Sequence, residues 1–130
     1  AAEHYLALLV YAWNTGDTQP FADMSAPTSK FASDYIKDVN EQYANGWNYG
    51  MESNITYVLR VEPIEANGDD VPEGSILVKF RTETDDGTSC TRTRLQSTST
   101  TYNSTVTFIM TWKDGGWKEV QGRTVGDDED

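Results

Sequence analysis

The side chains that could carry chemistry in this chain are few and widely spaced. The single histidine, His4, stands at the start, and a lone cysteine, Cys90, can form neither an intrachain disulfide nor a thiolate metal site. Arg92 and Arg94 lie near Cys90, where cations can activate a thiol, but such a cysteine is more often a small buried hydrophobe. No phosphate-binding glycine motif, metal-ligand spacing or nucleophile elbow occurs. The sequence therefore predicts no catalytic residue, no metal site and no cofactor.

Acidic residues form short pairs and dominate the overall charge. Asp69-Asp70, Asp85-Asp86 and Asp127-Asp128 could each hold a weak cation, but turn chemistry and solubility explain them more simply. The chain has 21 acidic and 10 basic residues, a formal net charge of −11. Such a charge disfavours nucleic acid and anionic membrane surfaces as partners and is typical of a well-solvated surface. A cationic protein partner is the sharper alternative.

The aromatic side chains are the better candidates for a binding site. Together they could line an open end of the fold and bind an apolar or sugar-like ligand. The alternative is that they fill the core. Trp47 and Tyr49 are expected to be the most exposed, since they lie in a junction between elements. The six candidate ligand-binding residues are Trp13, Tyr35, Tyr43, Trp47, Tyr49 and Trp112.

Three helical stretches near the N-terminus position three of these six aromatic residues. Residues 2–15 carry an apolar stripe too broad for a helix on a surface, which predicts contacts on more than one side. A short helix with Pro20 in its first turn follows a cap at Asp17 or Thr18. Residues 28–45 repeat apolar side chains every four positions and predict a third helix. Residues 47–50 then turn the chain into a sheet.

The rest of the chain alternates as strands do. Residues 104–113 place β-branched and aromatic side chains on every second position, which predicts a strand with one face in a core. A weaker strand is expected around residues 90–95, and the Ser/Thr-rich residues 96–103 are expected to form a loop or bulged edge. No inward position is Asp, Glu, His or Lys in this prediction. The expected inward side chains are Ile55, Tyr57, Leu59, Val61, Ile76, Val78, Phe80, Val106, Phe108, Met110 and Trp112.

The last hairpin can pair in two registers. A two-residue turn at Asp114-Gly115 pairs Trp112 with Trp117 and puts Val120 on the polar face. A three-residue turn that includes Gly116 pairs Lys113 with Trp117 and sets Val120 beside Met110 on the apolar face. We predict the second register because it keeps one face apolar.

These elements predict an α+β fold in which three N-terminal helices pack in the concavity of a strongly curved antiparallel sheet, making a cone. Residues 1–126 are expected to form one domain, and residues 127–130 an acidic, disordered tail. The longest apolar stretch, residues 5–13, is too short to span a membrane.

Three short motifs carry a resemblance to a known superfamily. They are Trp13-Asn14-Thr15-Gly16-Asp17, Tyr43-Ala44-Asn45-Gly46-Trp47 and Asp114-Gly115-Gly116-Trp117. In this order the chain resembles the cone-shaped nuclear transport factor 2-like superfamily over roughly residues 3–123. It is more closely similar to an uncharacterised family of secreted lipoprotein domains from high-GC Gram-positive bacteria. That family often has a pair of cysteines entering the third helix, where this chain has Ser29 and Ala32.

The resemblance implies an extracytoplasmic domain, secreted or anchored at the outer face of the cytoplasmic membrane by a lipid upstream of Ala1. With an apolar inner face, it favours a non-catalytic ligand- or protein-binding domain on the bacterial cell surface. The alternative is a small-molecule enzyme or carrier whose pocket is the cone interior. An inner cavity of roughly a few hundred Å³ with two or more buried polar groups converging on it would favour that alternative, and a filled interior would exclude it. The expected partner is an unknown small molecule or protein, and a homodimer through the sheet is left open.

Overall fold

The computed structural model describes residues 1–66, 71–85, 87–91, 94–97, 101–113 and 115–126. Its helices are α1 (Ala2–Thr15), α2 (Gln19–Asp23) and α3 (Lys30–Asn45). The strands are β1 (Gly46–Tyr49), β2 (Glu52–Pro63), β3 (Ile76–Asp85), β4 (Thr88–Thr91), β5 (Arg94–Ser97), β6 (Thr101–Lys113) and β7 (Gly116–Gly126). The order confirms helices first and sheet afterwards.

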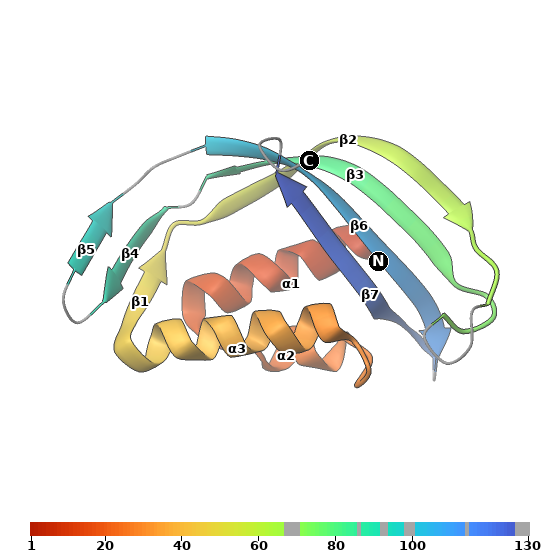
Figure 1. The fold of residues 1–130 in the computed structure, drawn as a ribbon, viewed down its shortest axis with the longest axis horizontal. Helices are drawn as coiled ribbons and strands as arrows, with labels where there is room; N and C mark the ends of the chain where they lie inside the picture. The colour runs from red at the N-terminus through yellow and green to blue at the C-terminus, as the bar shows by residue number, and fades with distance from the viewer. Residues whose placement is uncertain (67–70, 86, 92–93, 98–100, 114, 127–130) are drawn as a thin grey trace.

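The strands form two antiparallel sheets. The larger has the order β2-β3-β6-β7, and the smaller has the order β1-β4-β5. Figure 1 shows the larger sheet arching over α1, with α2 and α3 closing the concave side below it. The predicted fold, three helices in the concavity of a curved antiparallel sheet, is confirmed.

The core lies between α1 and the concave face of the larger sheet. Phe108 on β6 is fully buried, and its ring lies 4.9 Å from Tyr5 of α1 and 5.8 Å from Phe80 of β3. The wide apolar stripe of α1 is thus explained, because the sheet and α3 both pack against this helix. The buried apolar cluster is Ala2, Tyr5, Leu6, Leu9, Ala12, Phe21, Ala32, Phe80, Val106, Phe108 and Met110.

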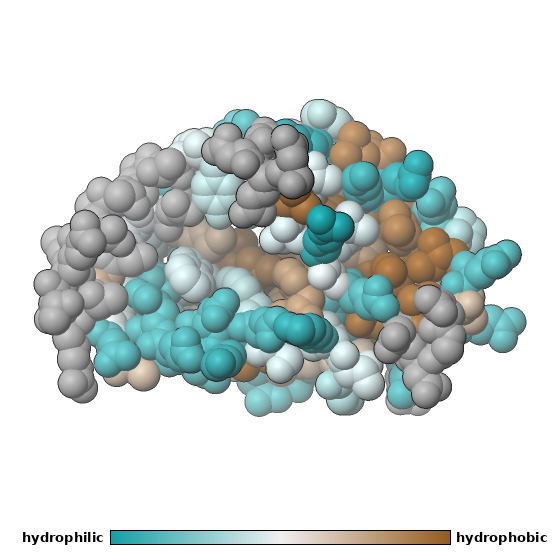
Figure 2. Space-filling model, viewed as in Figure 1, coloured by the Kyte–Doolittle hydropathy of each residue, from teal (hydrophilic) through white to brown (hydrophobic). Residues whose placement is uncertain are grey.

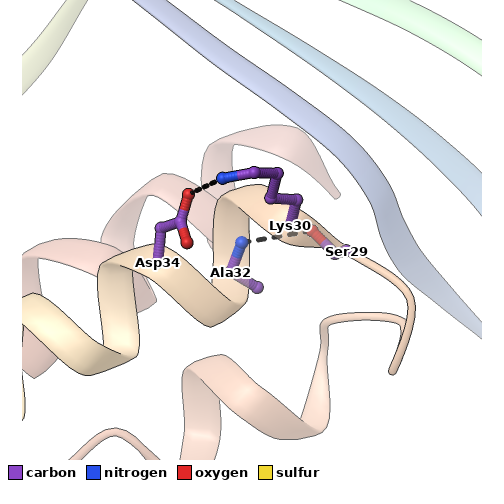
Figure 3. Close-up of polar contacts among 4 residues, drawn as sticks. All are labelled: Ser29, Lys30, Ala32 and Asp34. Carbon is purple, nitrogen blue, oxygen red and sulfur yellow. Dashed lines mark hydrogen bonds and ion pairs between the residues drawn. The ribbon is translucent and has the colours of Figure 1, made fainter.

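The ends of the long helices are determined by local chemistry. Gly16 ends α1 in the left-handed conformation (φ 79°), and a Cβ there would lie 2.9 Å from the Tyr43 ring. Ser29 caps α3 by accepting a hydrogen bond from the Ala32 amide at 3.2 Å. Lys30, the first residue of the helix, forms an exposed ion pair at 2.6 Å with Asp34, one turn further along (Figure 3).

Two local predictions in the middle of the chain are wrong. Residues 47–50 were expected to turn, but Gly46–Tyr49 is strand β1, paired with β4. The single strand expected around residues 90–95 is two short strands, β4 and β5, which pair with each other. Both errors concern the small sheet, where strands of four residues carry little alternation.

Four residues predicted to point into the cone are exposed. Two register shifts in β2 bring Val58 opposite Phe80, so Tyr57 and Leu59 lose the inward parity. Val61 lies opposite Val78 and Trp112 lies opposite Trp117, but both are exposed at strand ends that reach beyond the helices (Figure 1).

The predicted register of the last hairpin is also wrong. Trp112 pairs with Trp117 and Lys113 with Gly116, which is the two-residue alternative. A β-bulge further along β7 then places Glu119 opposite Met110 and Gln121 opposite Ile109, leaving Val120 as the extra residue. Both Glu119 and Val120 are buried as a result. Strict alternation would bury only one of two consecutive residues, and the bulge allows both to be buried.

Candidate functional site

An internal cavity of about 160 Å³ lies between the helices and the concave face of the larger sheet. Its helix side is apolar except for the Tyr35 hydroxyl, and its sheet side is rich in hydroxyl groups. The lining residues are Leu6, Leu9, Phe31, Tyr35, Met51, Ser53, Thr82, Thr84, Tyr102, Ser104, Val106, Phe108 and Thr124. The cone interior is therefore not filled.

The hydroxyl groups occupy neighbouring positions of the ladder. Thr82 on β3 lies opposite Ser104 on β6, and Thr84 lies opposite Tyr102 one pair further on. Ser53 and Thr84 share a hydrogen bond of 2.9 Å. Thr82 and Ser104 are buried, yet within the part of the chain that the structure describes their hydroxyls form no hydrogen bond. Neither oxygen is among the fully buried atoms that lack a partner, so both face the cavity, where water or a ligand with matching groups can bond to them.

Tyr35 holds the helix side of the cavity in place. Its hydroxyl donates to the Leu9 carbonyl at 3.0 Å, and its ring lies 5.3 Å from Phe21. Burial, followed by nearby Tyr102, Asp38 and Tyr43, raises the pKa of Tyr35. The phenol therefore stays neutral at physiological pH and joins α1 to α3 through the cavity wall.

The cavity opens between α3 and β7. An outer pocket of about 400 Å³ shares Phe31, Tyr35 and Thr124 with the inner cavity and is rimmed by Lys30, Asp34, Asp38 and Gly122. Figure 2 shows a hollow in this region, with hydrophobic atoms behind the hydrophilic surface of α3. A Cβ at Gly122 would lie 2.8 Å from the Phe31 ring, so glycine permits this close approach of β7 to α3. The entrance is charged and the interior is not.

The six aromatic residues predicted as ligand-binding do not form one site. Tyr35 lines the inner cavity, whereas Trp13 packs behind it with a ring distance of 6.3 Å. Trp47, Tyr49 and Trp112 are 44%, 72% and 59% exposed, respectively. Trp112 contacts Trp117 edge-on at 5.5 Å at the far end of the sheet.

Tyr43, the sixth of these residues, has a structural role. Its hydroxyl donates to the Trp13 carbonyl at 2.8 Å and also lies within 3.2 Å of the Asn48 carbonyl. The Asn48 side-chain amide donates to the same Trp13 carbonyl at 3.2 Å. These contacts join the end of α1 to β1, and desolvation by burial raises the pKa of Tyr43.

A buried carboxyl group, Glu119, contradicts the expectation that no inward residue is Asp, Glu, His or Lys. Its side chain is fully buried, and Ser29 donates a hydrogen bond of 3.0 Å to its Oε2. Its Oε1 has no hydrogen-bond partner within the described chain. The Glu119 backbone also accepts from the Ala26 amide at 2.7 Å and donates to the Met24 carbonyl at 2.9 Å. Glu119 thus joins the α2–α3 connection to the edge of the sheet.

The environment of Glu119 favours its protonated form. Desolvation raises its pKa to about 7, although hydrogen bonds from Ser29 and Tyr5 lower it in part. Tyr5 also shares a hydrogen bond of 2.7 Å with the Ser25 hydroxyl, and burial together with the Glu119 charge raises the pKa of Tyr5. Glu119 is not among the residues that line the inner cavity. The protonation state of Glu119 is therefore expected to affect how Tyr5 of α1, the α2–α3 connection and Ser29 at the start of α3 pack against β7.

Sequence reasoning missed the hydroxyl groups of the cavity for a simple reason. The predicted inward set stops at Phe80 on one strand and begins at Val106 on the other. Continuing the same alternation gives Thr82 and Thr84 after Phe80, and Ser104 before Val106. The signal was present, but the predicted inward set contained no serine or threonine.

A larger groove of about 510 Å³ lies beside the α2–α3 connection and the β6–β7 end of the sheet. Lys118, on its wall, donates to the Asp23 carbonyl, so this ammonium group already has a partner. Within the described residues no cluster of histidine, cysteine and acidic side chains is suited to hold a metal ion. No helix of the described part is long and apolar enough to cross a membrane. The inner cavity is the better candidate because it lies between the helices and the sheet and the hydroxyls of Thr82 and Ser104 line it.

The curved sheet and the helices within its concavity have the cone-shaped, nuclear transport factor 2-like fold. The chain is similar in fold to a nuclear transport factor 2-like protein of unknown function in nutrient uptake from Rhodospirillum rubrum, with TM-score 0.58 and 17% identity over 97% of this chain and 98% of that one. A calcium/calmodulin dependent protein kinase II association domain from Xanthomonas campestris is similar at TM-score 0.63 and 13% identity, covering 99% and 87%. The beta subunit of benzoate 1,2-dioxygenase from Burkholderia mallei is similar at TM-score 0.56 and 11% identity, covering 98% and 89%.

The family can be stated more narrowly than the fold. The chain belongs to the family described as Family of unknown function (DUF6318), which matches residues 1–122. No curated protein matches the chain. At identities of 17% or less, the similarity to these solved structures shows a shared fold alone.

Proposed function

We propose that this protein is a non-catalytic binding domain that takes a small, uncharged ligand into the cone interior. The observation that carries the proposal is that Thr82 and Ser104 line the cavity from adjacent strands, and that their hydroxyls form no hydrogen bond within the described chain and face the cavity. A ligand with hydroxyl or carbonyl groups on one edge would satisfy them, while its apolar faces would contact Leu6, Leu9 and Phe31.

The size and charge of the cavity define the ligand further. A cavity of about 150 Å³ holds a benzene-sized ring, and the inner cavity is about 160 Å³. No lysine, arginine, aspartate or glutamate is among its lining residues in the described chain. A charged group would lose its hydration there without gaining a counter-ion. A charged substituent could instead extend to the entrance, near Lys30 and Asp34.

The same residues argue for binding over catalysis. Acid–base chemistry near neutral pH requires a group that titrates in contact with the substrate. The serine and threonine hydroxyls of the wall do not titrate in this range. Glu119 does, but its carboxyl bonds to Ser29 away from the cavity lining. An enzyme or carrier using this pocket is the competing function, since the cavity is open and partly polar.

Ligand-detected NMR with a library of uncharged ring compounds of about six to ten heavy atoms tests the site. We expect Thr82→Val, which keeps the side-chain shape and removes the hydroxyl, to weaken binding about three- to tenfold. Ser104→Leu, which fills the cavity, should abolish binding.

The matched controls are Thr107→Val and Thr107→Leu, because Thr107 lies on the opposite face of β6. They should leave affinity unchanged. The proposal fails if no compound binds the wild type, or if Ser104→Leu binds as well as the control. Turnover of a bound compound, lost with Thr82→Val, would favour the enzyme.

The cellular location is a separate proposal. The resemblance to secreted lipoprotein domains of high-GC Gram-positive bacteria supports an extracytoplasmic domain anchored by a lipid. In the organism of origin, external protease should digest the full-length protein on intact cells. Protection until the cells are lysed would contradict this location.

A further inference from the structure

A row of basic side chains crosses the convex face of the larger sheet. Arg60 on β2 lies opposite Lys79 on β3, Lys79 lies opposite Thr107 on β6, and Thr107 lies opposite Arg123 on β7. Residues directly opposite each other in an antiparallel sheet point to the same side. Because the neighbouring Phe108 is buried on the concave side, this row faces away from the helices.

The rows on either side add a fourth cation and apolar contact area. Arg81 lies in the next row, where it donates to the Thr105 hydroxyl at 2.8 Å, beside the exposed ring of Tyr57. On the other side, Leu77 and Ile109 are half-buried. The convex face therefore combines cations with an aromatic ring and aliphatic side chains.

The charge of these two rows contrasts with the flanking rows of the same face, which carry Glu62 on one side and Glu83, Asp85 and Glu52 on the other. Four of the ten basic residues lie in these two rows, in a chain with 21 acidic residues. Arg60 has a partner on the same strand, Glu62 at 3.5 Å. Lys79 and Arg123 form no ion pair or hydrogen bond within the described part of the chain. The Lys79 ammonium group and the Arg123 guanidinium group are thus available to an external anion.

We propose that this convex face binds an acidic segment of a partner polypeptide. Adjacent strands lie about 4.8 Å apart, so Arg60 and Lys79 are separated by about 5 Å, and Lys79 and Arg123 by about 10 Å. Carboxylates on one face of an extended peptide recur about every 7 Å and can reach such a row. The aliphatic side chains and Tyr57 can contact the stems of the same peptide.

The net charge favours a short acidic segment over other anionic partners. Nucleic acid and anionic membranes present dense charge that the remaining surface, with a net charge of −11, repels. A second copy paired through this face would place the basic row against itself, since a two-fold interface repeats the same patch. The row lies on the opposite side of the sheet from the cavity, so this proposal does not depend on the proposed function.

Fluorescence anisotropy with a labelled, glutamate-rich peptide of about ten residues tests the proposal in low salt. We expect the wild type to bind the peptide and the double variant Lys79→Gln/Arg123→Gln to bind it about tenfold more weakly. Raising NaCl to about 0.5 M should weaken wild-type binding strongly, because exposed charges are screened.

The matched control is Lys30→Gln/Lys37→Gln, which changes the net charge equally on α3, where both lysines already have partners. It should bind the peptide as the wild type does. Circular dichroism and thermal unfolding verify that all variants are folded. An equal loss in the control, or no binding by the wild type, overturns the proposal.

Competing partners are tested in the same way. Tighter wild-type binding of single-stranded RNA, or of phosphatidylglycerol vesicles, than of the peptide would overturn the assignment to a polypeptide. Sedimentation that shows a dimer, converted to monomer by substitution of Lys79 and Arg123, would assign the face to a second copy instead.

Discussion

A carboxyl group buried without a cation beside it keeps its proton to higher pH than one in water, and Glu119 is such a group. Its Oε2 accepts from Ser29, its Oε1 has no partner in the described chain, and its pKa is raised to about 7. The protonated acid can donate a hydrogen bond in this setting, whereas the carboxylate cannot. Glu119 should therefore make its own contribution to the pH dependence of the domain's stability.

The first prediction concerns this pH dependence. Glu119 holds its proton up to about pH 7 in the folded state but only to about pH 4.5 when unfolded, so the folded state binds more protons in between. The contribution is present below pH 4.5 and is lost as pH rises towards 7, a change of about 3 kcal/mol. Urea unfolding at several pH values should show this fall for the wild type relative to Glu119→Gln. Parallel pH profiles for the two proteins would contradict it.

The second prediction compares two aromatic residues on β6. Phe108 is fully buried among Tyr5, Phe31 and Phe80, so Phe108→Ala should lower the free energy of unfolding by about 3–5 kcal/mol. Trp112→Ala is the control, because Trp112 is mostly exposed and should cost under about 1 kcal/mol. Denaturant unfolding measures both. A reversed order would mean that the concave face is assigned incorrectly.

At the scale of elements, the start of α3 and the bulge of β7 depend on each other. Ser29 accepts from the Ala32 amide as the helix cap, and its hydroxyl donates to Glu119. The backbone of Glu119 also pairs with the α2–α3 connection. Ser29 thus caps the start of α3 and donates a hydrogen bond to one of the two carboxyl oxygens of the buried Glu119.

The third prediction follows from this double role. Ser29→Ala should lower the free energy of unfolding by about 1–3 kcal/mol, because it removes a cap and a hydrogen bond to a buried group. It should also raise the pKa of Glu119 further, since the Ser29 bond lowers that pKa. Ser33→Ala, at an exposed position of the same helix, is the control and should change stability by less than about 0.5 kcal/mol. Equal effects at Ser29 and Ser33 would rule out the capping role.

The elements also show why the fold could be predicted and the site only in part. Alternation around Phe80 and Phe108 is a local pattern, so the concave face was correctly identified at its centre. The bulges in β2 and β7 cannot be found from that pattern. Each bulge adds one residue to its strand, so the side chains beyond it point to the face opposite to the one that strict alternation predicts. Tyr57 was therefore assigned to the wrong face, and the burial of Glu119 was not predicted.

At the scale of the whole molecule, electrostatic repulsion should influence stability. A net charge of −11 on a chain of 130 residues favours expansion, and only three ion pairs, all exposed, are recorded among the described residues. Exposed pairs of this kind contribute little.

The fourth prediction is that NaCl stabilises the domain. Raising its concentration from about 10 mM to 0.5 M shortens the range of repulsion from about 30 Å to a few Å, so the melting temperature should rise by several degrees. Thermal unfolding at neutral pH measures the effect. Near the sequence pI of about 4.3 the net charge vanishes, and the same salt change should have little effect. A melting temperature that falls with salt at neutral pH would show that local attraction exceeds repulsion.

By itself, the sequence determined the order and type of the long elements, the net charge and the apolar centre of the concave face of the sheet. These properties follow from periodicity and composition, which are local to the chain. The tertiary structure alone decided the hairpin register, the burial of Glu119, the hydroxyl-lined cavity and the alignment of Arg60, Lys79 and Arg123 across strands. Each of these depends on which distant residues become neighbours, and that is decided only when helices and strands pack together.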